Sequence, residues 1–382
     1  MPSIKFNKLP TLLTTPAYYA IRSLAAAAAA PDLPRMLSLA RRAGHALGSS
    51  RISRSKLARA TENIAVAFPD WSPDQQRHYA LLAYEHLFML AVEMIYTPRL
   101  LSHEGWAGRV DLSKLESTVR SALASRPVIF ICGHCGNWEM AGYSLALLGF
   151  PLHALYRPLD LKPADEWVRD VRSRRGLVLV DKFGAAKQLP SIVNAGAPLG
   201  FVADQNAGDR GIFVPFFNRF ASTYKAIGLT ATRYNATIVV GLALRKSPPI
   251  PSSLLHTNLR PEPEGLTYEI QAADVFGPED WSTHPDPLFY IAARYRRAIE
   301  LSVRLAPEQN LWMHRFWKSR PRWERQNKPI PDSILEKVRA LPWTTDHDLY
   351  QLQEHTKRDT AAYHASNPSS HTPDPEPEEA LA

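Results

Sequence analysis

Residues 127–140 hold side chains whose types and spacing could support two different chemistries. Cys132 and Cys135 are separated by Gly-His, and a dithiol at this spacing, between a strand end and a helix start, lowers a thiol pKa for redox exchange. His134 is followed five residues later by Glu139, and a nearby carboxylate can orient an imidazole that acts as a general base. The two interpretations describe different enzymes.

The elements around His134 determine which interpretation is geometrically reasonable. The apolar run 128–131 predicts a buried strand, Gly133 permits a tight turn, and a helix is expected from Asn137. Five residues of a regular helix rotate by about 140°, so we expect His134 in the turn and Glu139 in the first helical turn. Ligands of open α/β sheets bind at this edge, where exposed amides at the helix start could stabilise an oxyanion.

The dithiol interpretation is weaker than the spacing suggests. Ile-Phe-Ile precedes Cys132, whereas disulfide isomerases have an aromatic-rich approach, and the α/β pattern continues well beyond a thioredoxin-like domain. A structural zinc site would need a second ligand pair at suitable spacing. We expect two small buried apolar residues and no metal. A thioredoxin-like redox protein using Cys132 and Cys135 stays a remote alternative.

The chain alternates short β-rich runs with amphipathic segments. Strands are expected at 128–131, 152–156, 177–180, 199–203 and 237–244. Helices are expected at 138–148, 164–175, 185–195, 222–235 and 287–305, with a hairpin or edge strand at 254–274. This order predicts an α/β fold with a mostly parallel central sheet flanked by helices.

The two ends of the chain differ in composition from its centre. Ten Lys or Arg residues and one acid, Asp32, occur in the first sixty residues, and the apolar stretch 9–31 is interrupted by Arg22. We expect residues 1–50 to be a basic, amphipathic, helical membrane-associating segment rather than a clean span. Residues 51–345 would form the catalytic domain, and 346–382 a disordered, acidic, proline-rich tail. No nucleic-acid-binding motif is recognisable, so no nucleic acid partner is expected.

Polar side chains follow several of the expected elements. Arg157 ends one strand, Asp204 ends another, and Arg172 lies among arginines that crowd the end of the helix at 164–175. Arginine is suited to bidentate contacts with phosphate. We therefore expect these residues at the ligand-binding edge of the sheet.

An apolar segment at 211–217 follows Asp204. It contains Phe213 and Phe217, and it is expected to be a loop that either packs in the core or lines a hydrophobic ligand site. Ser222 and Thr223 are expected to open the next helix, where they would act as simple N-caps.

Taken together, these motifs resemble the bacterial lipid A late acyltransferases, the lauroyl and myristoyl transferases of lipopolysaccharide assembly. The resemblance spans roughly residues 50–322 and rests on His134-x4-Glu139, 156–158, Arg172 ahead of Gly176, 204–205, 213–217 with 222–223, 307–318 and 63–69. It implies a catalytic dyad of His134 and Glu139 and a functional role for Arg172 and Asp204. It also implies an inner-membrane enzyme that uses acyl carrier protein thioesters.

The resemblance implies direct acyl transfer without cofactor or covalent enzyme intermediate. His134 would deprotonate a glycolipid hydroxyl and Glu139 would orient His134. Arg172 would hold an anionic group, and Asp204 would pair with that arginine or position a hydroxyl. The substrate-contacting set is completed by Arg157, Phe213, Phe217 and Ser222, with the two phenylalanines beside the acyl chain. The enzyme is expected at the cytoplasmic face of the inner membrane, peripheral or with one N-terminal anchor. A mannosyl-phosphoinositide is the alternative acceptor, because related acyltransferases share the dyad.

Overall fold

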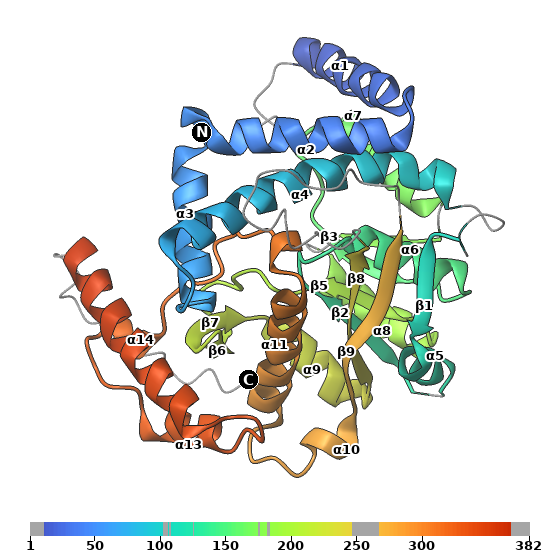
Figure 1. Cartoon of the computed structure of the whole chain (residues 1–382). Coiled ribbons are helices and arrows are strands. Elements are labelled where there is room, and N and C mark those ends of the chain that lie inside the picture. Colours follow the sequence, from blue (N-terminus) through green and yellow to red (C-terminus); the bar gives the residue numbers. More distant parts are fainter. Residues whose placement is uncertain are drawn as a thin grey trace.

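A seven-stranded sheet forms the centre of the protein in the computed structural model, which describes residues 11–101, 106, 108–124, 126–174, 176–181, 184–246 and 267–367 (Figure 1). The strand order is β1-β9-β8-β2-β5-β3-β4. All neighbours are parallel except β8 and β9, which confirms the expected mostly parallel sheet. The strands are β1 (Val110–Lys114), β2 (Val128–Cys132), β3 (His153–Tyr156), β4 (Val178–Asp181), β5 (Leu199–Val202), β8 (Thr237–Arg245) and β9 (Tyr268–Phe276).

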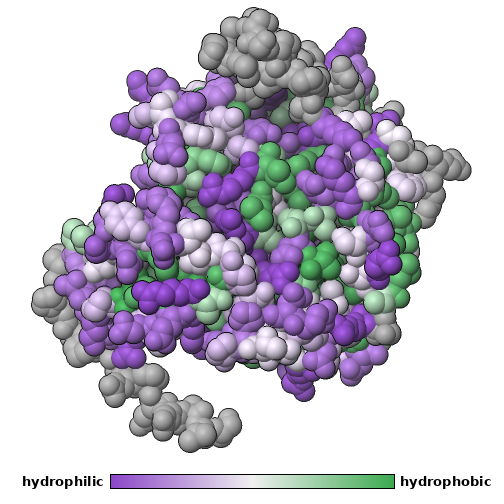
Figure 2. Space-filling view, turned by 60° about the horizontal axis from the view of Figure 1, so that its bottom comes forward, coloured by the Kyte–Doolittle hydropathy of each residue, from purple (hydrophilic) through white to green (hydrophobic). Residues whose placement is uncertain are grey.

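The central strand β2 explains why the sheet is covered on both faces. Ile129 and Ile131 pack into one core cluster, and Val128 and Phe130 into the other. Side chains alternate across a strand, and a parallel strand buried on both faces reads as a continuous apolar run. Helices therefore have to lie on both sides of the sheet. On the face of the molecule shown in Figure 2, hydrophobic residues reach the surface in separate groups bordered by hydrophilic ones.

The helices that follow the strands lie close to their expected ranges, except those at 116–123 and 278–281, which were not expected from the sequence. They are α5 (Glu116–Leu123), α6 (Trp138–Leu147), α7 (Lys162–Ser173), α8 (Ala185–Asn194), α9 (Lys225–Tyr234), α10 (Pro278–Trp281) and α11 (Pro287–Leu305). Helix α11 packs against α9 and the β6–β7 hairpin, described below, and supplies much of one core cluster. The expected segment 254–274 is described only from residue 267, where it leads into β9.

Four helices precede the sheet and lie together at one end of the molecule (Figure 1). They are α1 (Thr11–Ala29), α2 (Leu33–Ser49), α3 (Arg54–Ala67) and α4 (Pro73–Leu100), with a short 3-10 turn η2 (Arg51–Ser53). Helix α2 packs on α4 so closely that a Cβ at Gly44 would lie 2.6 Å from the carbonyl oxygen of Tyr84. Residues 33–49 are thus part of the folded body, although the sequence suggested a separate segment ending at residue 50.

Helix α4 is the only described helix long and apolar enough to cross a membrane, over Pro73–Thr97. Two thirds of its most apolar window (67%) is buried inside the protein. Ser72 and Gln75 close its start with a reciprocal capping box. These features are those of a core helix, and the hydrophobicity of α4 is accounted for by burial.

A small hairpin replaces the loop that was expected at 211–217. Strands β6 (Ile212–Phe216) and β7 (Arg219–Thr223) pair antiparallel through a two-residue turn, in which Phe217 and Asn218 both have φ of 51°. A two-residue turn with two positive φ angles matches the twist of the strands it joins. Ser222 and Thr223 consequently end β7, and α9 begins after Tyr224, which corrects the expected helix N-cap.

The C-terminal part contains η4 (Pro307–Gln309), α12 (Arg322–Arg325), α13 (Asp332–Arg339) and α14 (Asp346–Ser366). Helix α14 corrects the expected start of the disordered tail at residue 346. Its Asp359 makes ion pairs with Arg219 and Arg320, and Leu352 is buried in the core. These contacts order a segment that is polar in sequence. Residues 368–382 lie outside the described residues.

Candidate active site

The backbone around His134 is fixed by contacts on both sides of the turn. The carbonyl oxygen of His134 accepts a hydrogen bond from the amide of Leu311 (3.0 Å), and the amide of Gly136 donates to the carbonyl of Gln309 (2.9 Å). Gly136 has φ of +66°, and a Cβ there would lie 2.1 Å from the carbonyl oxygen of Ala243. The turn between β2 and α6 is therefore specified by close backbone approach, and it holds the imidazole at the carboxyl edge of the sheet.

Asp204 is the carboxylate that pairs with His134. Nδ1 of His134 lies 2.6 Å from one Asp204 carboxylate oxygen, and the amide of His134 donates to the other at 2.9 Å. Asp204 follows β5, which is the parallel neighbour of β2, so both residues leave the sheet at the same edge. Burial alone would raise the pKa of Asp204, yet the imidazole and amide of His134 hold that pKa below its usual value. An ionised Asp204 keeps the proton on Nδ1 of His134 and leaves Nε2 free as a base.

Glu139 is paired with Arg172 and not with His134. Arg172 Nε donates to one Glu139 oxygen at 3.0 Å, and its second guanidinium nitrogen contacts the other, which makes a bidentate pair. Both residues are described, and the structure gives no hydrogen bond between Glu139 and His134. The sequence predicted that Glu139 would contact His134 and that Asp204 could pair with Arg172. In the structure Asp204 contacts His134 and Glu139 pairs with Arg172. The order of strands, which brings β5 beside β2, is the reason.

The amides of the turn are already used by the fold. Those of His134, Gly136 and Asn137 donate to Asp204, Gln309 and the carbonyl of Ala243. The amide of Met140 donates to the side chain of Asn137 at 2.9 Å. The expectation that these helix-start amides stabilise an oxyanion is therefore not met by these four groups, because each of them has a protein acceptor.

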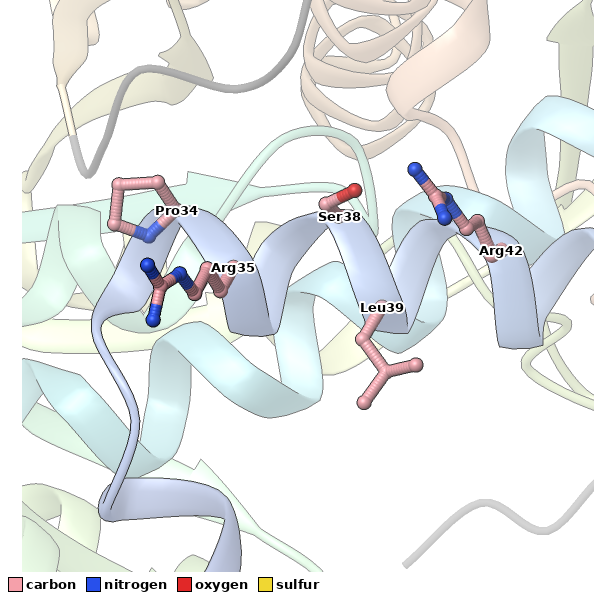
Figure 3. A pocket seen from close by; sticks show the side chains of 5 residues that line it. All are labelled: Pro34, Arg35, Ser38, Leu39 and Arg42. Atoms are coloured by element: carbon pink, nitrogen blue, oxygen red, sulfur yellow. The ribbon is translucent and has the colours of Figure 1, made fainter.

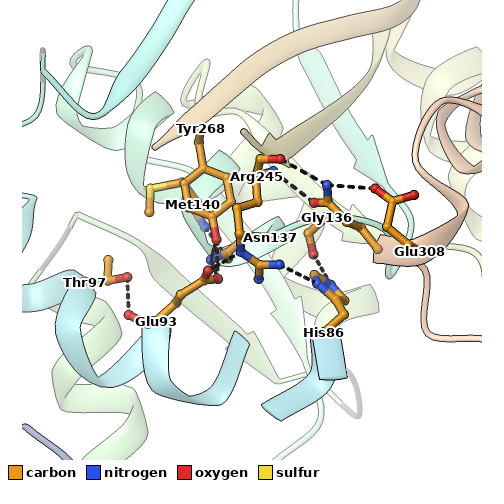
Figure 4. A network of polar contacts seen from close by, with 10 residues as sticks. His86, Glu93, Thr97, Gly136, Asn137, Met140, Arg245, Tyr268 and Glu308 are labelled. Atoms are coloured by element: carbon orange, nitrogen blue, oxygen red, sulfur yellow. Dashed lines mark hydrogen bonds and ion pairs between the residues drawn. The ribbon is translucent and has the colours of Figure 1, made fainter. Parts of the chain in front are cut away.

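A buried polar network supports the start of α6 (Figure 4). Asn137 donates to Glu93 of α4 at 3.1 Å, and Glu93 also accepts from Arg245 of β8 and Tyr268 of β9. His86 Nε2 donates to the carbonyl oxygen of Gly136 at 3.1 Å. Burial, together with the nearby Arg245, lowers the pKa of His86 well below its usual value, so this imidazole is neutral.

This network was missed from the sequence. Its members lie on four separate elements that meet only in the folded chain, and each looks unremarkable alone. Networks of this kind, when every member is paired, rigidify the elements they join.

His314, in the segment 307–318, is a second imidazole beside His134 and was not predicted as a site residue. The ring centroids of the two histidines are 4.5 Å apart, and the ring of Trp138 lies 4.7 Å from His134 in an edge-to-face arrangement. Burial and the neighbouring His134 lower the pKa of His314 to about 4. The sequence feature that could have indicated this histidine is the spacing of Trp312 and His314 after a Pro-Glu-Gln turn.

Arg296 of α11 lies beneath Asp204 and is fully buried. Its guanidinium donates to the carbonyl of Asp204, to Thr223 Oγ1 (3.1 Å) and to the carbonyl of Ser222 (3.3 Å). Burial lowers its pKa from an ordinary arginine value. The guanidinium thus ties the end of β5 to the end of β7 and fixes the backbone from which the Asp204 side chain extends.

The other residues expected to contact substrate differ in their exposure and in their distance from the sheet edge. Arg157 is exposed just after β3, the parallel neighbour of β5, and therefore lies at the same sheet edge as His134 and Asp204. Phe217 is 2% exposed and packs in the core, and Ser222 is fully buried with its hydroxyl on the carbonyl of Gly208. Phe213 is partly buried next to Trp323. Phe217 and Ser222 therefore support the fold beneath the site and line no open surface.

The two cysteines are free and point to different partners. Cys132 contacts the carbonyl of Phe201 (3.8 Å), and Cys135 contacts those of Ser302 and Ala306 (both 3.7 Å). Burial raises the pKa of both thiols, which keeps them protonated. A redox dithiol needs the opposite shift, so the geometry favours the imidazole chemistry.

Comparison with known proteins shows the family to which the chain belongs. Residues 8–319 match the sequence profile of the family described as bacterial lipid A biosynthesis acyltransferase. The chain belongs to this family. It is therefore an acyltransferase, and the resemblance seen in its motifs is confirmed.

Three relatives illustrate the similarity. The chain is 28% identical over 280 residues to a lipid A biosynthesis palmitoleoyltransferase of Escherichia coli (strain K12), covering 70% of this chain and 80% of the relative. The same values apply to a lipid A biosynthesis acyltransferase of Shigella flexneri. A lipid A biosynthesis lauroyltransferase of Escherichia coli (strain K12) is 24% identical over 270 residues, covering 68% of this chain and 78% of the relative.

Proposed function

We propose that this member of the family transfers a fatty acyl chain from an acyl carrier protein thioester to a hydroxyl of a lipid A-type glycolipid. The observation that carries the proposal is the contact of His134 Nδ1 with the buried Asp204, which leaves Nε2 of His134 as the base. A base of this kind suits deprotonation of a hydroxyl during acyl transfer.

The proposed reaction has two steps. Nε2 of His134 takes the hydroxyl proton while the hydroxyl oxygen forms a bond to the thioester carbon, and the carbonyl electron pair moves to oxygen. The tetrahedral intermediate then collapses, the carbon–sulfur bond breaks, and the proton on His134 passes to the departing thiolate. Asp204 balances the charge of the imidazolium between the two steps.

The ion pair of Glu139 and Arg172 is proposed to bind an anionic group. Glu139 contacts two of the guanidinium nitrogens and holds the plane of Arg172 in one orientation. The remaining N–H groups of Arg172 can then donate to a phosphate or carboxylate of donor or acceptor. Arg157 at the same sheet edge provides a second cation, and Phe213 is proposed to border the acyl chain.

The first two helices are proposed to contact the cytoplasmic face of the inner membrane. Large apolar side chains are well exposed there, including Tyr19 (62%), Leu24 (71%) and Leu39 (58%). Leu39 shares a shallow hollow on α2 with Pro34, Ser38 and two arginines, Arg35 and Arg42 (Figure 3). Apolar side chains beside arginines suit the boundary between anionic headgroups and acyl chains.

The test is acyl transfer by the full-length protein in detergent micelles, with a labelled acyl carrier protein thioester as donor and a lipid A precursor as acceptor. We expect acylated glycolipid from the unmodified protein and none from His134→Ala at equal thermal stability. Transfer that survives His134→Ala would exclude this base. Cys132→Ser combined with Cys135→Ser should keep most of the transfer, and total loss in that variant would restore a thiol mechanism.

A further inference from the structure

We propose that His314 is a second catalytic residue, whose Nε2–H stabilises the oxyanion that forms on the thioester carbonyl when His134 activates the acceptor. This role rests on the proposed acyl transfer. It assigns the oxyanion donor to a side chain, in place of the helix-start amides expected from the sequence.

The position of His314 is fixed by a separate part of the chain. Asn63 of α3 donates from its side-chain nitrogen to the carbonyls of Trp312 (2.7 Å) and His314 (2.8 Å). The amide of His314 donates to the carbonyl of Leu311, and Leu311 in turn donates to the carbonyl of His134. The two histidines are therefore held in register through two consecutive backbone hydrogen bonds, with 4.5 Å between their ring centroids. Donors fixed before the reaction begins stabilise developing charge most effectively.

One ring nitrogen of His314, Nε2, has no hydrogen-bond partner. Within the described part of the chain, Nε2 of His314 is buried and makes no hydrogen bond. A buried polar atom without a partner destabilises the folded state and is rare in native proteins. A carbonyl oxygen that reacts beside His134 would supply the missing acceptor. The cost in the free enzyme would then be removed as the oxyanion forms.

Four backbone donors of the turn that carries His134 are already engaged. The amides of His134, Gly136, Asn137 and Met140 all donate to protein acceptors. The indole of Trp138 meets the His134 ring edge to face. The buried Nε2 of His314, which has no partner among the described residues, therefore remains as a donor beside the base.

The charge state of His314 is consistent with this role. His134 becomes a cation when it accepts the proton, and a second cation 4.5 Å away would oppose that step. Burial and His134 lower the pKa of His314 to about 4, so it is neutral at physiological pH. A neutral imidazole can still polarise a carbonyl through its N–H.

The experiment compares His314→Phe, His314→Gln and His314→Asn in full-length protein, with kcat and KM measured for acyl transfer from the carrier thioester. The amide nitrogen of Gln occupies nearly the position of Nε2, whereas that of Asn is closer to Nδ1. We expect kcat to fall about 10²- to 10³-fold in His314→Phe with little change in KM, and Gln to restore more activity than Asn. His347→Phe, at an exposed histidine of α14, is the matched control and keeps the wild-type rate.

Three outcomes overturn the assignment. They are a kcat of His314→Phe close to that of the unmodified protein, a His314→Gln variant as slow as His314→Phe at equal thermal stability, and equal rates of Gln and Asn. The Gln and Asn comparison still decides if His314→Phe fails to fold. Absence of transfer by the unmodified protein would instead overturn the proposed function, and the role of His314 with it.

Discussion

Asp204 and Glu139 are both buried carboxylates, yet they differ in what they can do for a base. Asp204 touches both the ring and the amide of His134, so its charge acts directly on the proton that His134 gains. Glu139 is occupied by Arg172. In the proposed mechanism, the short motif of His134 and Glu139 therefore combines the base with part of an anion-binding pair, and the carboxylate that contacts His134 is 70 residues away.

We expect Asp204→Asn and Glu139→Gln to affect different kinetic constants. Asn at position 204 removes the charge that stabilises the imidazolium, so kcat should fall by about 10³-fold or more. Gln at position 139 loosens Arg172, so KM for the anionic substrate should rise more than kcat falls. Steady-state acyl transfer measures both, with Asp332→Asn on α13 as control. The partner exchange is wrong if the Gln variant loses kcat while the Asn variant keeps it.

The lowered pKa of His314 predicts a pH-dependent stability. In the unfolded chain this imidazole gains a proton near pH 6.5, but in the folded protein only near pH 4. Between these values the unfolded state binds more protons, so stability falls as pH decreases, by up to about 3 kcal/mol from this group. Denaturant unfolding at pH 7, 5.5 and 4.5 should show a smaller loss for His314→Gln than for the unmodified chain. Parallel losses in both proteins would contradict the lowered pKa.

Among the elements, the turn between β2 and α6 determines where the imidazole lies. Five of its backbone groups are fixed by the segment at 309–311, by Ala243, by His86 and by Asp204. The turn is thus positioned by α4, β8 and the segment after α11, and its own sequence provides the glycine that permits the close approach.

Gly136→Ala should be far more harmful than Gly149→Ala. Both glycines have positive φ, +66° and +91°, but a Cβ at 149 meets nothing within 4 Å, whereas one at 136 lies 2.1 Å from a carbonyl oxygen. Backbone strain alone costs about 1 kcal/mol, so Gly149→Ala should lose about that much and keep its activity. Gly136→Ala should lose several-fold more stability and its acyl transfer, as measured by denaturant unfolding and the transfer assay. Equal effects of the two substitutions would refute the steric argument.

Local patterns were sufficient to predict most elements, because β-branched runs and helical periodicity are properties of neighbouring residues. The strands at 128–132 and 237–245 and the helix at 287–305 follow directly from such patterns. The hairpin at 212–223 was missed because its turn is Phe-Asn rather than a glycine-containing pair. The carboxylate of the base was assigned to Glu139 because strand order is not a local property. His314 was passed over for the same reason.

At the scale of the whole molecule, the first two helices present one surface to the core and another to the exterior. Helix α2 is packed on α4 through Gly44 and Gly48, so its inner face belongs to the core. Its outer face and α1 carry exposed apolar side chains and arginines. Deleting residues 1–50 would therefore damage the fold as well as any membrane contact, and surface substitutions are the cleaner test.

We expect Leu24→Ser combined with Leu39→Ser to weaken binding to vesicles that contain anionic lipid. Each exposed leucine contributes about 1–2 kcal/mol when it leaves water, so the pair should reduce partitioning by roughly tenfold or more. Vesicle co-sedimentation measures the change, and Leu123→Ser on α5, at a leucine that is 73% exposed, is the control. If the control weakens binding as much as the pair, α1 and α2 are not the membrane-contacting elements.

Helix α14 should be required for stability despite its polar sequence. Asp359 pairs with Arg219 of the hairpin and with Arg320, whose side chain is only 9% exposed. Ending the chain at residue 345 removes this carboxylate and leaves both guanidinium groups without it, which is expected to cost several kcal/mol. Thermal unfolding of the truncated and full-length chains measures the loss. An unchanged melting temperature would show that α14 contributes nothing to the fold.

The burial of Cys132 and Cys135 has a practical consequence for studying this enzyme on a bilayer. Alkylating dyes attack thiolates, and the pKa of both native thiols is raised, so maleimide or iodoacetamide probes should label the folded chain slowly. A cysteine introduced at Leu39 or Leu24 would then be the only fast-reacting position. A polarity-sensitive fluorophore attached there would report whether α1 and α2 enter the lipid, without first removing the native sulfurs next to His134.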